Sequence, residues 1–128
     1  MLAKAKHRPT ALIVDDDRAV REMYSSYLAA KGINTVEAED GLHAVAKATS
    51  ILPDVITTDI RLPVVNGIQL CRSLKRGELT RHIPVIAILG SASQNEVAAA
   101  KKAGCVSVLM KPCLPETLLN EIWRVLLL

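Results

Sequence analysis

Charged side chains follow three of the short apolar runs in this chain, at the point where each run ends. Asp15, Asp16 and Asp17 come directly after one run, Asp59 follows another, and Lys111 follows a third. Carboxylates brought together raise one another's pKa unless a cation lies between them, and Mg²⁺ prefers carboxylate oxygens. A lysine ammonium beside such an ion suits a phosphoryl group, because both positive charges neutralise its oxygens. These residue types indicate a site that holds a divalent cation and a phosphate together.

Each of these residues also has an ordinary structural explanation. A run of three Asp after a strand is common in turns that cap helices, and we expect Asp17 to be such a cap. Asp59 could be a turn residue before the loop that holds Pro63, and Lys111 could be a surface lysine beside Pro112. The conjunction favours chemistry, because three separate strand ends each present a charge that one metal-phosphate site needs.

Short β-branched runs alternate with longer segments of helical periodicity, which is the pattern of strand–helix units around a parallel sheet. We expect strands at 11–14, 34–38, 55–58, 85–89 and 106–110. We expect helices between Asp17 and Gly32, between Asp40 and Pro53, around Ile68 up to Gly77, between Ser93 and Gly104, and from Pro115 onward. The predicted fold class is α/β, with a doubly wound five-stranded parallel sheet. Ligands of such sheets bind beyond the carboxyl ends of the strands.

The combined motifs resemble the receiver domain of response regulators in two-component signalling, chemotaxis receivers included. The resemblance rests on the two acidic residues after the first run, the acidic residue and loop after the third, and the Lys-Pro pair after the fifth: Asp15, Asp16, Asp59, Pro63, Gly67, Lys111 and Pro112. It covers about residues 10–126 and implies a flavodoxin-like sheet with strand order 2-1-3-4-5. We expect a receiver domain at 10–128 after a basic, solvated tail at 1–9.

The resemblance also implies a role for each site residue. Asp59 would be the phosphoacceptor, receiving the phosphoryl group from a phosphohistidine on a histidine kinase or phosphotransfer protein. Asp16, Asp59 and the backbone carbonyl of Arg61 would ligate Mg²⁺ (or Mn²⁺), and Asp15 would act mainly through a water. Lys111 would contact a phosphoryl oxygen. Such a domain is not an enzyme, apart from self-catalysed phosphorylation and dephosphorylation, and it acts through a downstream effector protein.

Three positions depart from the pattern of the family. Leu89 replaces the hydroxyl residue that usually ends the fourth strand, and leucine has no hydrogen-bond donor. Ser91, two residues further on, could supply the hydroxyl instead. Val108 replaces an aromatic residue, and Cys113 replaces a hydrophobic one. Two hypotheses for signalling stay open: phosphorylation shifts a pre-existing equilibrium, or the domain binds its partner whatever its phosphorylation state.

The composition of the chain excludes several other classes of protein. The chain has 128 residues, of which 50% are hydrophobic, with no Phe and a net charge of +3. This suits one domain with an aliphatic core and supplies few aromatic side chains for reading bases, so we expect no direct DNA binding. Three cysteines without a CxxC pair suggest reduced thiols in the cytoplasm, without a metal or redox role. No apolar run approaches membrane-spanning length, and the scattered His7, His43 and His82 do not suggest a zinc site.

Two apolar stripes run along the last predicted helix, formed by Leu118, Ile122 and Val125 and by Leu119, Trp123 and Leu127. One stripe suits the core of the domain. The second would cover either the same core, with Trp123 flat on the domain, or a partner. We predict weak self-association or docking through this helix.

Two other classes share part of the pattern. A haloacid-dehalogenase-type phosphatase uses an Asp nucleophile after its first strand, which would make Asp15 the phosphorylated residue instead of Asp59. Ala19 lacks the hydroxyl or β-branch of that motif, and the chain is short for that fold. A flavodoxin-like flavin binder needs a hydroxyl-rich phosphate loop and stacking aromatics, and this sequence provides neither.

Overall fold

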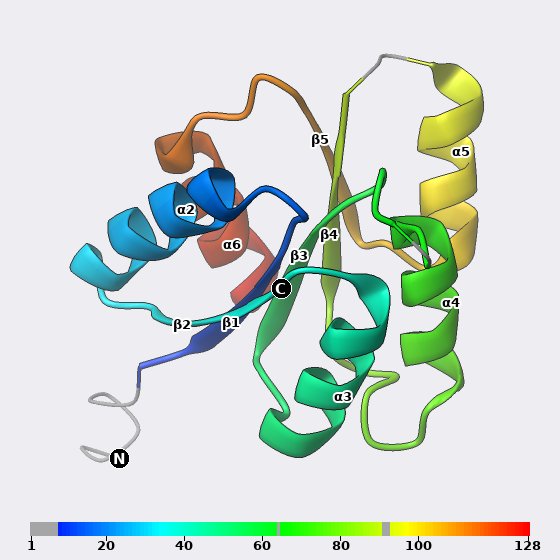
Figure 1. Cartoon of the computed structure of the whole chain (residues 1–128), viewed down its shortest axis with the longest axis horizontal. Helices are drawn as coiled ribbons and strands as arrows, with labels where there is room; N and C mark the ends of the chain where they lie inside the picture. The colour runs from blue at the N-terminus through cyan, green and yellow to red at the C-terminus, as the bar shows by residue number, and fades with distance from the viewer. Residues whose placement is uncertain (1–7, 64, 91–92) are drawn as a thin grey trace.

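One parallel sheet lies at the centre of the computed structural model, which describes residues 8–63, 65–90 and 93–128 (Figure 1). Its strands are β1 (Thr10–Val14), β2 (Asn34–Ala38), β3 (Val55–Asp59), β4 (Val85–Leu89) and β5 (Ser107–Met110). Hydrogen bonds order the strands β2-β1-β3-β4-β5, and every neighbouring pair is parallel. The predicted doubly wound sheet and its strand order are confirmed.

Helices cover both faces of the sheet. They are α2 (Arg18–Ala30), α3 (Gly41–Ile51), α4 (Gly67–Arg76), α5 (Gln94–Ala103) and α6 (Pro115–Leu126). Figure 1 shows α2 and α6 over one face and α3, α4 and α5 over the other. The chain moves outward from β1 to β2 and then returns to β3 on the other side of β1. The loops after β1 and β3 therefore meet at the edge where the winding reverses.

Side chains at the start of the helices explain why the helices begin where they do. Asp17, Asp40 and Ser93 each accept a hydrogen bond from a backbone N–H in the first turn of α2, α3 and α5, as predicted. Helix α4 begins with a capping box that the sequence analysis did not anticipate. Asn66 accepts from the backbone of Gln69, and the Gln69 side chain accepts from the backbone of Asn66.

The ends of the elements lie close to their predicted positions. Gly77 follows α4, Gly104 follows α5 with a φ of 110°, and Gly32 follows the end of α2 with a φ of 95°. Strand β5 begins at Ser107 rather than Val106. The backbone N–H of Val106 still bonds to β4, so this boundary differs by a single residue.

Aliphatic side chains fill the core on both sides of the sheet. The side facing α3, α4 and α5 buries Leu12, Ile56, Leu70, Leu74 and Leu89. The side facing α2 and α6 buries Ile13, Leu28, Ile86, Leu118 and Ile122. Successive strand residues point to opposite faces, so one apolar run supplies both layers of the core. This is the aliphatic core that the absence of Phe predicts.

The basic residue at the end of the predicted tail contacts the domain. The Arg8 guanidinium donates to the backbone carbonyls of Ala29 and Gly32, at 3.2 and 3.3 Å, and so satisfies carbonyl groups at the end of α2. The rest of the predicted tail lies outside the described residues. Among the helices that the structure describes, none is long and apolar enough to cross a bilayer.

Candidate functional site

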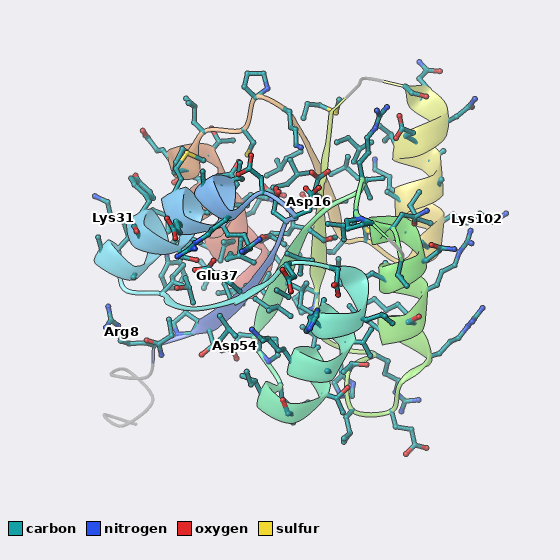
Figure 2. All side chains as sticks on the ribbon, viewed as in Figure 1. Arg8, Asp16, Lys31, Glu37, Asp54 and Lys102 are labelled. Carbon is teal, nitrogen blue, oxygen red and sulfur yellow. The ribbon has the colours of Figure 1, made fainter. Side chains whose placement is uncertain are left out.

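Three carboxylates meet beyond the carboxyl ends of β1 and β3. Asp15 and Asp16 follow β1, and Asp59 is the last residue of β3. One oxygen from each lies within 4.8 Å of the others. Asp15 and Asp59 are 6% and 5% exposed, whereas Asp16 is exposed, and Figure 2 shows it at the end of β1. The expected convergence of these side chains is what the structure shows.

Lys111 reaches the same pocket from the end of β5. Its Nζ lies 2.7 Å from Oδ2 of Asp59, while the backbone N–H of Arg61 donates to the other Asp59 oxygen at 3.1 Å. Burial lowers the pKa of Lys111, but the hydrogen bond and charge of Asp59, together with the charges of Asp15 and Asp16, outweigh burial and raise it. The ammonium therefore stays protonated beside the Asp59 carboxylate.

The crowded pocket disfavours ionisation of Asp15. Burial is the largest cause that raises the pKa of Asp15, and the charges of Asp59 and Asp16 raise it further. The backbone N–H of Asp17, which donates to Asp15 Oδ1 at 2.9 Å, and the charge of Lys111 act in the opposite direction without cancelling the shift. A bound cation would relieve this repulsion.

Arg21 supports the loop that carries Asp15, and the sequence analysis did not identify it. Its Nη1 donates to the backbone carbonyl of Asp15 at 2.8 Å, and its Nε donates to the Glu37 carboxylate at 3.2 Å. The side chain is 13% exposed, so this contact is largely shielded from water. A basic residue in the first turn of α2 was the signal available. Its partners come from two strand ends and depend on the tertiary fold.

Gly67 allows the start of α4 to lie against the end of β3. A Cβ atom at this position would lie 2.6 Å from the backbone oxygen of Asp59 and 2.8 Å from Cα of Ile60. The backbone N–H of Gly67 bonds to the Ile60 carbonyl at 2.9 Å. The loop after β3 therefore closes tightly under Asp59, which explains why a glycine belongs to the motif.

Two of the departures from the family pattern, Leu89 at the end of β4 and Val108 within β5, pack as aliphatic side chains in the structure. Leu89 is fully buried in the core facing α3, α4 and α5, and Val108 packs against the same core. Leu89 therefore contributes packing here and offers no donor to the pocket. Ser91, the suggested substitute hydroxyl, lies outside the described residues.

An apolar groove of about 600 Å³ adjoins the pocket. Its lining includes Val20, Met23, Tyr24, Ile88, Gly90, Pro112, Cys113, Leu114 and Pro115, with Asp15 and Lys111 at its polar end. The Tyr24 hydroxyl donates to the backbone carbonyl of Cys113 at 2.6 Å. This hydrogen bond joins α2 to the loop after β5 and holds that loop next to Lys111.

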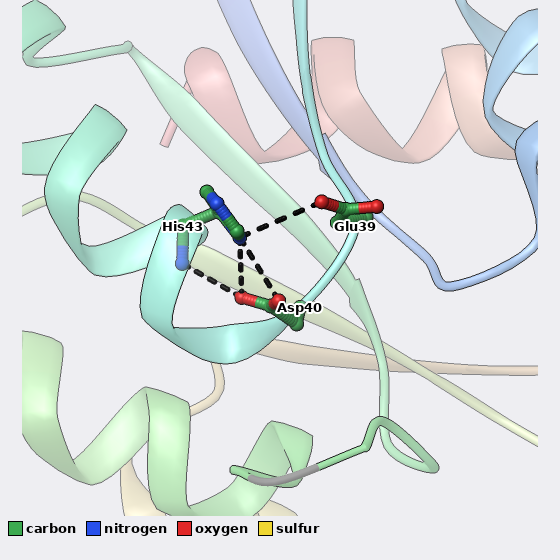
Figure 3. A group of neighbouring side chains, drawn as sticks. All are labelled: Glu39, Asp40 and His43. Carbon is green, nitrogen blue, oxygen red and sulfur yellow. Dashed lines mark hydrogen bonds and ion pairs between the residues drawn. The ribbon is translucent and has the colours of Figure 1, made fainter.

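A second group of possible ligands lies at the start of α3 (Figure 3). His43 Nδ1 is 2.9 Å from each Asp40 oxygen and 3.8 Å from a Glu39 oxygen. The pKa of Asp40 is lowered by hydrogen bonds from the backbone N–H and then the ring of His43. These contacts form a helix cap, and the positive end of the α3 dipole disfavours a cation there. His43 lies at the surface, as predicted.

The match to a known family settles the class of the chain. A family model described as "Response regulator receiver domain" matches residues 11–123. The chain belongs to this family. The receiver domain is 33% identical over 103 residues to the polar-differentiation response regulator DivK of Brucella ovis, which covers 80% of this chain and 84% of that protein.

Solved structures agree with this assignment. The receiver domain is similar to the chemotaxis response regulator CheY4 of Vibrio cholerae, with a TM-score of 0.88, 31% identity, and coverage of 93% of this chain and 99% of that chain. A putative response regulator from Chloroflexus aurantiacus gives a TM-score of 0.89 at 30% identity, covering 95% and 100%. The predicted resemblance is confirmed, and the dehalogenase and flavin-binding alternatives are not supported.

Family membership gives the general function. Receiver domains act in two-component signalling, where they are in general phosphoacceptors rather than enzymes and interact with histidine kinases and effectors. They bind Mg²⁺ in an acidic pocket, and Asp15, Asp16 and Asp59 form such a pocket here.

Proposed function

We propose that this receiver domain accepts a phosphoryl group on Asp59 from the phosphohistidine of a histidine kinase or phosphotransfer protein. The observation that carries the proposal is the set of contacts at Asp59. This nearly buried carboxylate has Lys111 Nζ at 2.7 Å from one oxygen and the backbone N–H of Arg61 at 3.1 Å from the other. Two further carboxylates lie within 4.8 Å. A carboxylate in such surroundings is a workable nucleophile toward phosphorus.

The donor set of the pocket fits Mg²⁺, or Mn²⁺ in its place. Three carboxylates close enough to share one ion supply the hard oxygen ligands that these cations prefer. In this proposal Asp16 and Asp59 hold the ion with the backbone carbonyl of Arg61, and Asp15 acts mainly through a water. When bound, Mg²⁺ supplies positive charge that neutralises carboxylate and phosphoryl oxygens.

The transfer step follows from the position of Asp59. An Asp59 oxygen attacks the phosphorus atom, the bond between phosphorus and the donor imidazole nitrogen breaks, and an acyl phosphate forms on Asp59. Lys111 exchanges its contact with Asp59 Oδ2 for a phosphoryl oxygen and stabilises the charge that develops there. The same residues would support self-phosphorylation from small acyl phosphates and slow self-dephosphorylation.

Incubation of the full chain with acetyl phosphate and Mg²⁺ tests the proposal. We expect one phosphoryl adduct by intact mass and peptide mapping to place it on Asp59. Asp59→Asn removes the adduct, while Asp17→Asn retains it, because Asn caps helix α2 as well as Asp does. An adduct on Asp15, or one that persists in Asp59→Asn, contradicts the proposal.

Leu89 and Val108 favour a second possibility for output, in which the domain binds its effector whatever its phosphorylation state. Neither side chain can donate a hydrogen bond to a phosphoryl group. Effector affinity measured with and without a phosphoryl mimic separates the two schemes. A ratio near one between the affinities with and without the mimic supports phosphorylation-independent binding. A large ratio that Ser91→Ala removes supports a substitute hydroxyl at that position.

We further propose weak self-association through α6. Leu118, Ile122 and Val125 are buried, whereas Trp123 and Leu127 are 37% and 81% exposed. The second apolar stripe is thus only partly covered by the domain. Sedimentation at increasing concentration tests this: identical behaviour of wild type, Trp123→Ala and Leu127→Ala contradicts it. A cytoplasmic location and no direct binding to DNA or membranes complete the proposal.

A further inference from the structure

Two exposed apolar side chains line the groove beside the carboxylate pocket, and neither is part of the core. Met23 on α2 is 44% exposed, and Leu114, which precedes α6, is 65% exposed. Leu114 is also the N-cap residue of α6, and its side chain makes no capping hydrogen bond. Serine, threonine, asparagine or aspartate at an N-cap stabilises a helix, whereas leucine does not. An exposed leucine at this position therefore adds little stability, which points to a ligand for the groove.

The groove has the size and the lining of a small-molecule site. Its volume of about 600 Å³ lies within the range of roughly 300–1,000 Å³ that is typical of ligand pockets, which are mostly apolar with a few polar groups. Here Val20, Ile88 and Pro112 supply apolar surface, and Asp15 and Lys111 supply the polar groups at one end. The matching ligand has an apolar chain and a charged head.

Lys111 connects this groove to the carboxylate pocket. Its side chain lines the groove, while its Nζ lies 2.7 Å from Oδ2 of Asp59. Asp59 itself is not part of the groove lining, so a chain that fills the groove leaves the Asp59 carboxylate uncovered. A phosphoryl head suits the Lys111 end of the groove, because an ammonium group binds phosphoryl oxygens through charge-assisted hydrogen bonds.

We propose that the groove binds the hydrocarbon chain of acyl phosphates and so makes medium-chain acyl phosphates better small-molecule phosphodonors than acetyl phosphate. This inference rests on the proposed function, because Asp59 is the acceptor in both. An Asp59 oxygen attacks phosphorus, the bond between phosphorus and the acyl oxygen breaks, and that oxygen keeps the electron pair and leaves as a carboxylate. The phosphoryl group stays on Asp59, and no oxidant, reductant or proton donor is required.

Burial of the chain sets the expected size of the preference. A fully buried methylene changes affinity about fourfold, and an open groove buries only part of each methylene, so we expect the second-order rate constant for hexanoyl phosphate to exceed that for acetyl phosphate about tenfold. The chain contacts the groove equally before and during transfer. The preference therefore lies in KM rather than in kcat.

Initial rates of the full chain with acetyl, butyryl and hexanoyl phosphate, each with Mg²⁺, test the inference. The leaving carboxylates have nearly the same basicity, so intrinsic reactivity changes little along this series. Intact mass spectrometry measures the adduct over time, and we expect the rate constant to rise with chain length. Rate constants that are equal, or that fall with chain length, would overturn the inference and leave the proposed function standing. Adducts from none of the three donors would overturn both.

Leu114→Ser separates a ligand role of Leu114 from a structural one. Serine supplies the missing N-cap, so the variant should unfold at a higher temperature than wild type. The ratio of the hexanoyl to the acetyl rate constant should nevertheless fall about threefold, and Met23→Gln should lower it as well. Leu79→Ser, in the turn after α4 and 58% exposed, is the matched control and should keep the wild-type ratio. An unchanged ratio in both groove variants, or an equal fall in Leu79→Ser, is the result that excludes the groove as the site of the chain.

Discussion

The carboxylate pocket of Asp15, Asp16 and Asp59 differs in chemistry from two positions in the neighbouring strands, Leu89 in β4 and Val108 in β5. In the pocket, charged groups contact one another, with Lys111 and the backbone of Arg61 bonded to Asp59. Beside it, Leu89 and Val108 contribute only aliphatic packing. The carboxylates of the pocket come from the ends of β1 and β3, whereas Leu89 ends β4, so the carboxylates and this departure from the family pattern lie on separate strands. Under the proposed function, the acceptor chemistry and the signal output would therefore depend on different residues.

The largest effect is expected from Lys111→Met, which tests the charged pocket by removing its only lysine contact to Asp59 among the described residues. The variant keeps the length of the side chain but removes the ammonium that would stabilise charge on the phosphoryl oxygens. We expect the rate of phosphorylation by acetyl phosphate to fall about a hundredfold, the usual cost of removing one such donor. Mass spectrometry over time measures the rate. Lys101→Met, on the exposed face of α5, is the matched control, and equal rates in the two variants would refute the role of Lys111.

Leu89→Thr tests whether the Leu89 side chain stabilises the core, in contrast to the charged pocket. It shortens a fully buried side chain and introduces a hydroxyl into an aliphatic core, so we expect the free energy of unfolding to fall by about 2–3 kcal/mol. Leu89→Ile keeps the volume and should cost about 1 kcal/mol or less. Chemical denaturation measures both. If the threonine variant is as stable as wild type, Leu89 does not contribute the packing described here.

Tyr24→Phe tests the hydrogen bond that joins α2 to the loop beside Lys111. Loss of the buried 2.6 Å bond to the Cys113 carbonyl should lower the free energy of unfolding by about 1–2 kcal/mol. Burial and then Cys113 raise the pKa of Tyr24 above its ordinary value of 10.0. The stability that this hydroxyl contributes is therefore complete below pH 10 and is lost as pH rises through the folded-state pKa.

Alkaline denaturation of Tyr24→Phe and Tyr27→Phe provides the comparison for this prediction. Tyr27 is partly buried and its ring lies 5.5 Å from the Lys31 ammonium, so removal of its hydroxyl leaves that contact in place. Only the Tyr24 variant should lose part of the pH dependence above pH 10. The same dependence in both variants would mean that the Cys113 bond adds no stability.

Asp15→Asn is expected to have the smallest effect on the free energy of unfolding. The direction of that change tests whether the pocket disfavours ionisation of Asp15. Because the pKa of Asp15 is raised above 3.8, its contribution to stability is complete below pH 3.8 and is lost as pH rises through the folded-state pKa. At neutral pH the amide should increase the free energy of unfolding by roughly 1 kcal/mol, a typical size for one substitution. Its oxygen can still accept from the backbone N–H of Asp17.

Thermal unfolding with and without Mg²⁺ measures this effect and tests the metal site. Mg²⁺ should raise the unfolding temperature of wild type, because a ligand that binds only the folded state stabilises it. The increase should be smaller in Asp15→Asn and unchanged in Asp17→Asn, because residue 17 caps α2 and the asparagine amide can still do so. A destabilised Asp15→Asn, or an undiminished response to Mg²⁺, would contradict the account of the pocket.

The sequence by itself determined the elements and the types of residue at their ends. Asp17, Asp40 and Ser93 cap the helices that they were expected to cap, because a cap needs only the backbone of the next turn. Short β-branched runs likewise predicted the strands, and charge at three strand ends indicated Asp59 and Lys111 as site residues. These inferences depend on periodicity and on neighbours within a few residues along the chain.

Only the tertiary structure decided which distant groups touch. The contact of Arg21 with the Asp15 carbonyl, the burial of Leu89 on the α4 side of the sheet, and the hydrogen bond from the Cys71 thiol to the Ala103 carbonyl follow from strand order and helix packing. Local periodicity predicts which residues share one face of a helix or strand, but it does not predict which other element packs against that face. The partners of these residues are set by the folding of the whole sheet.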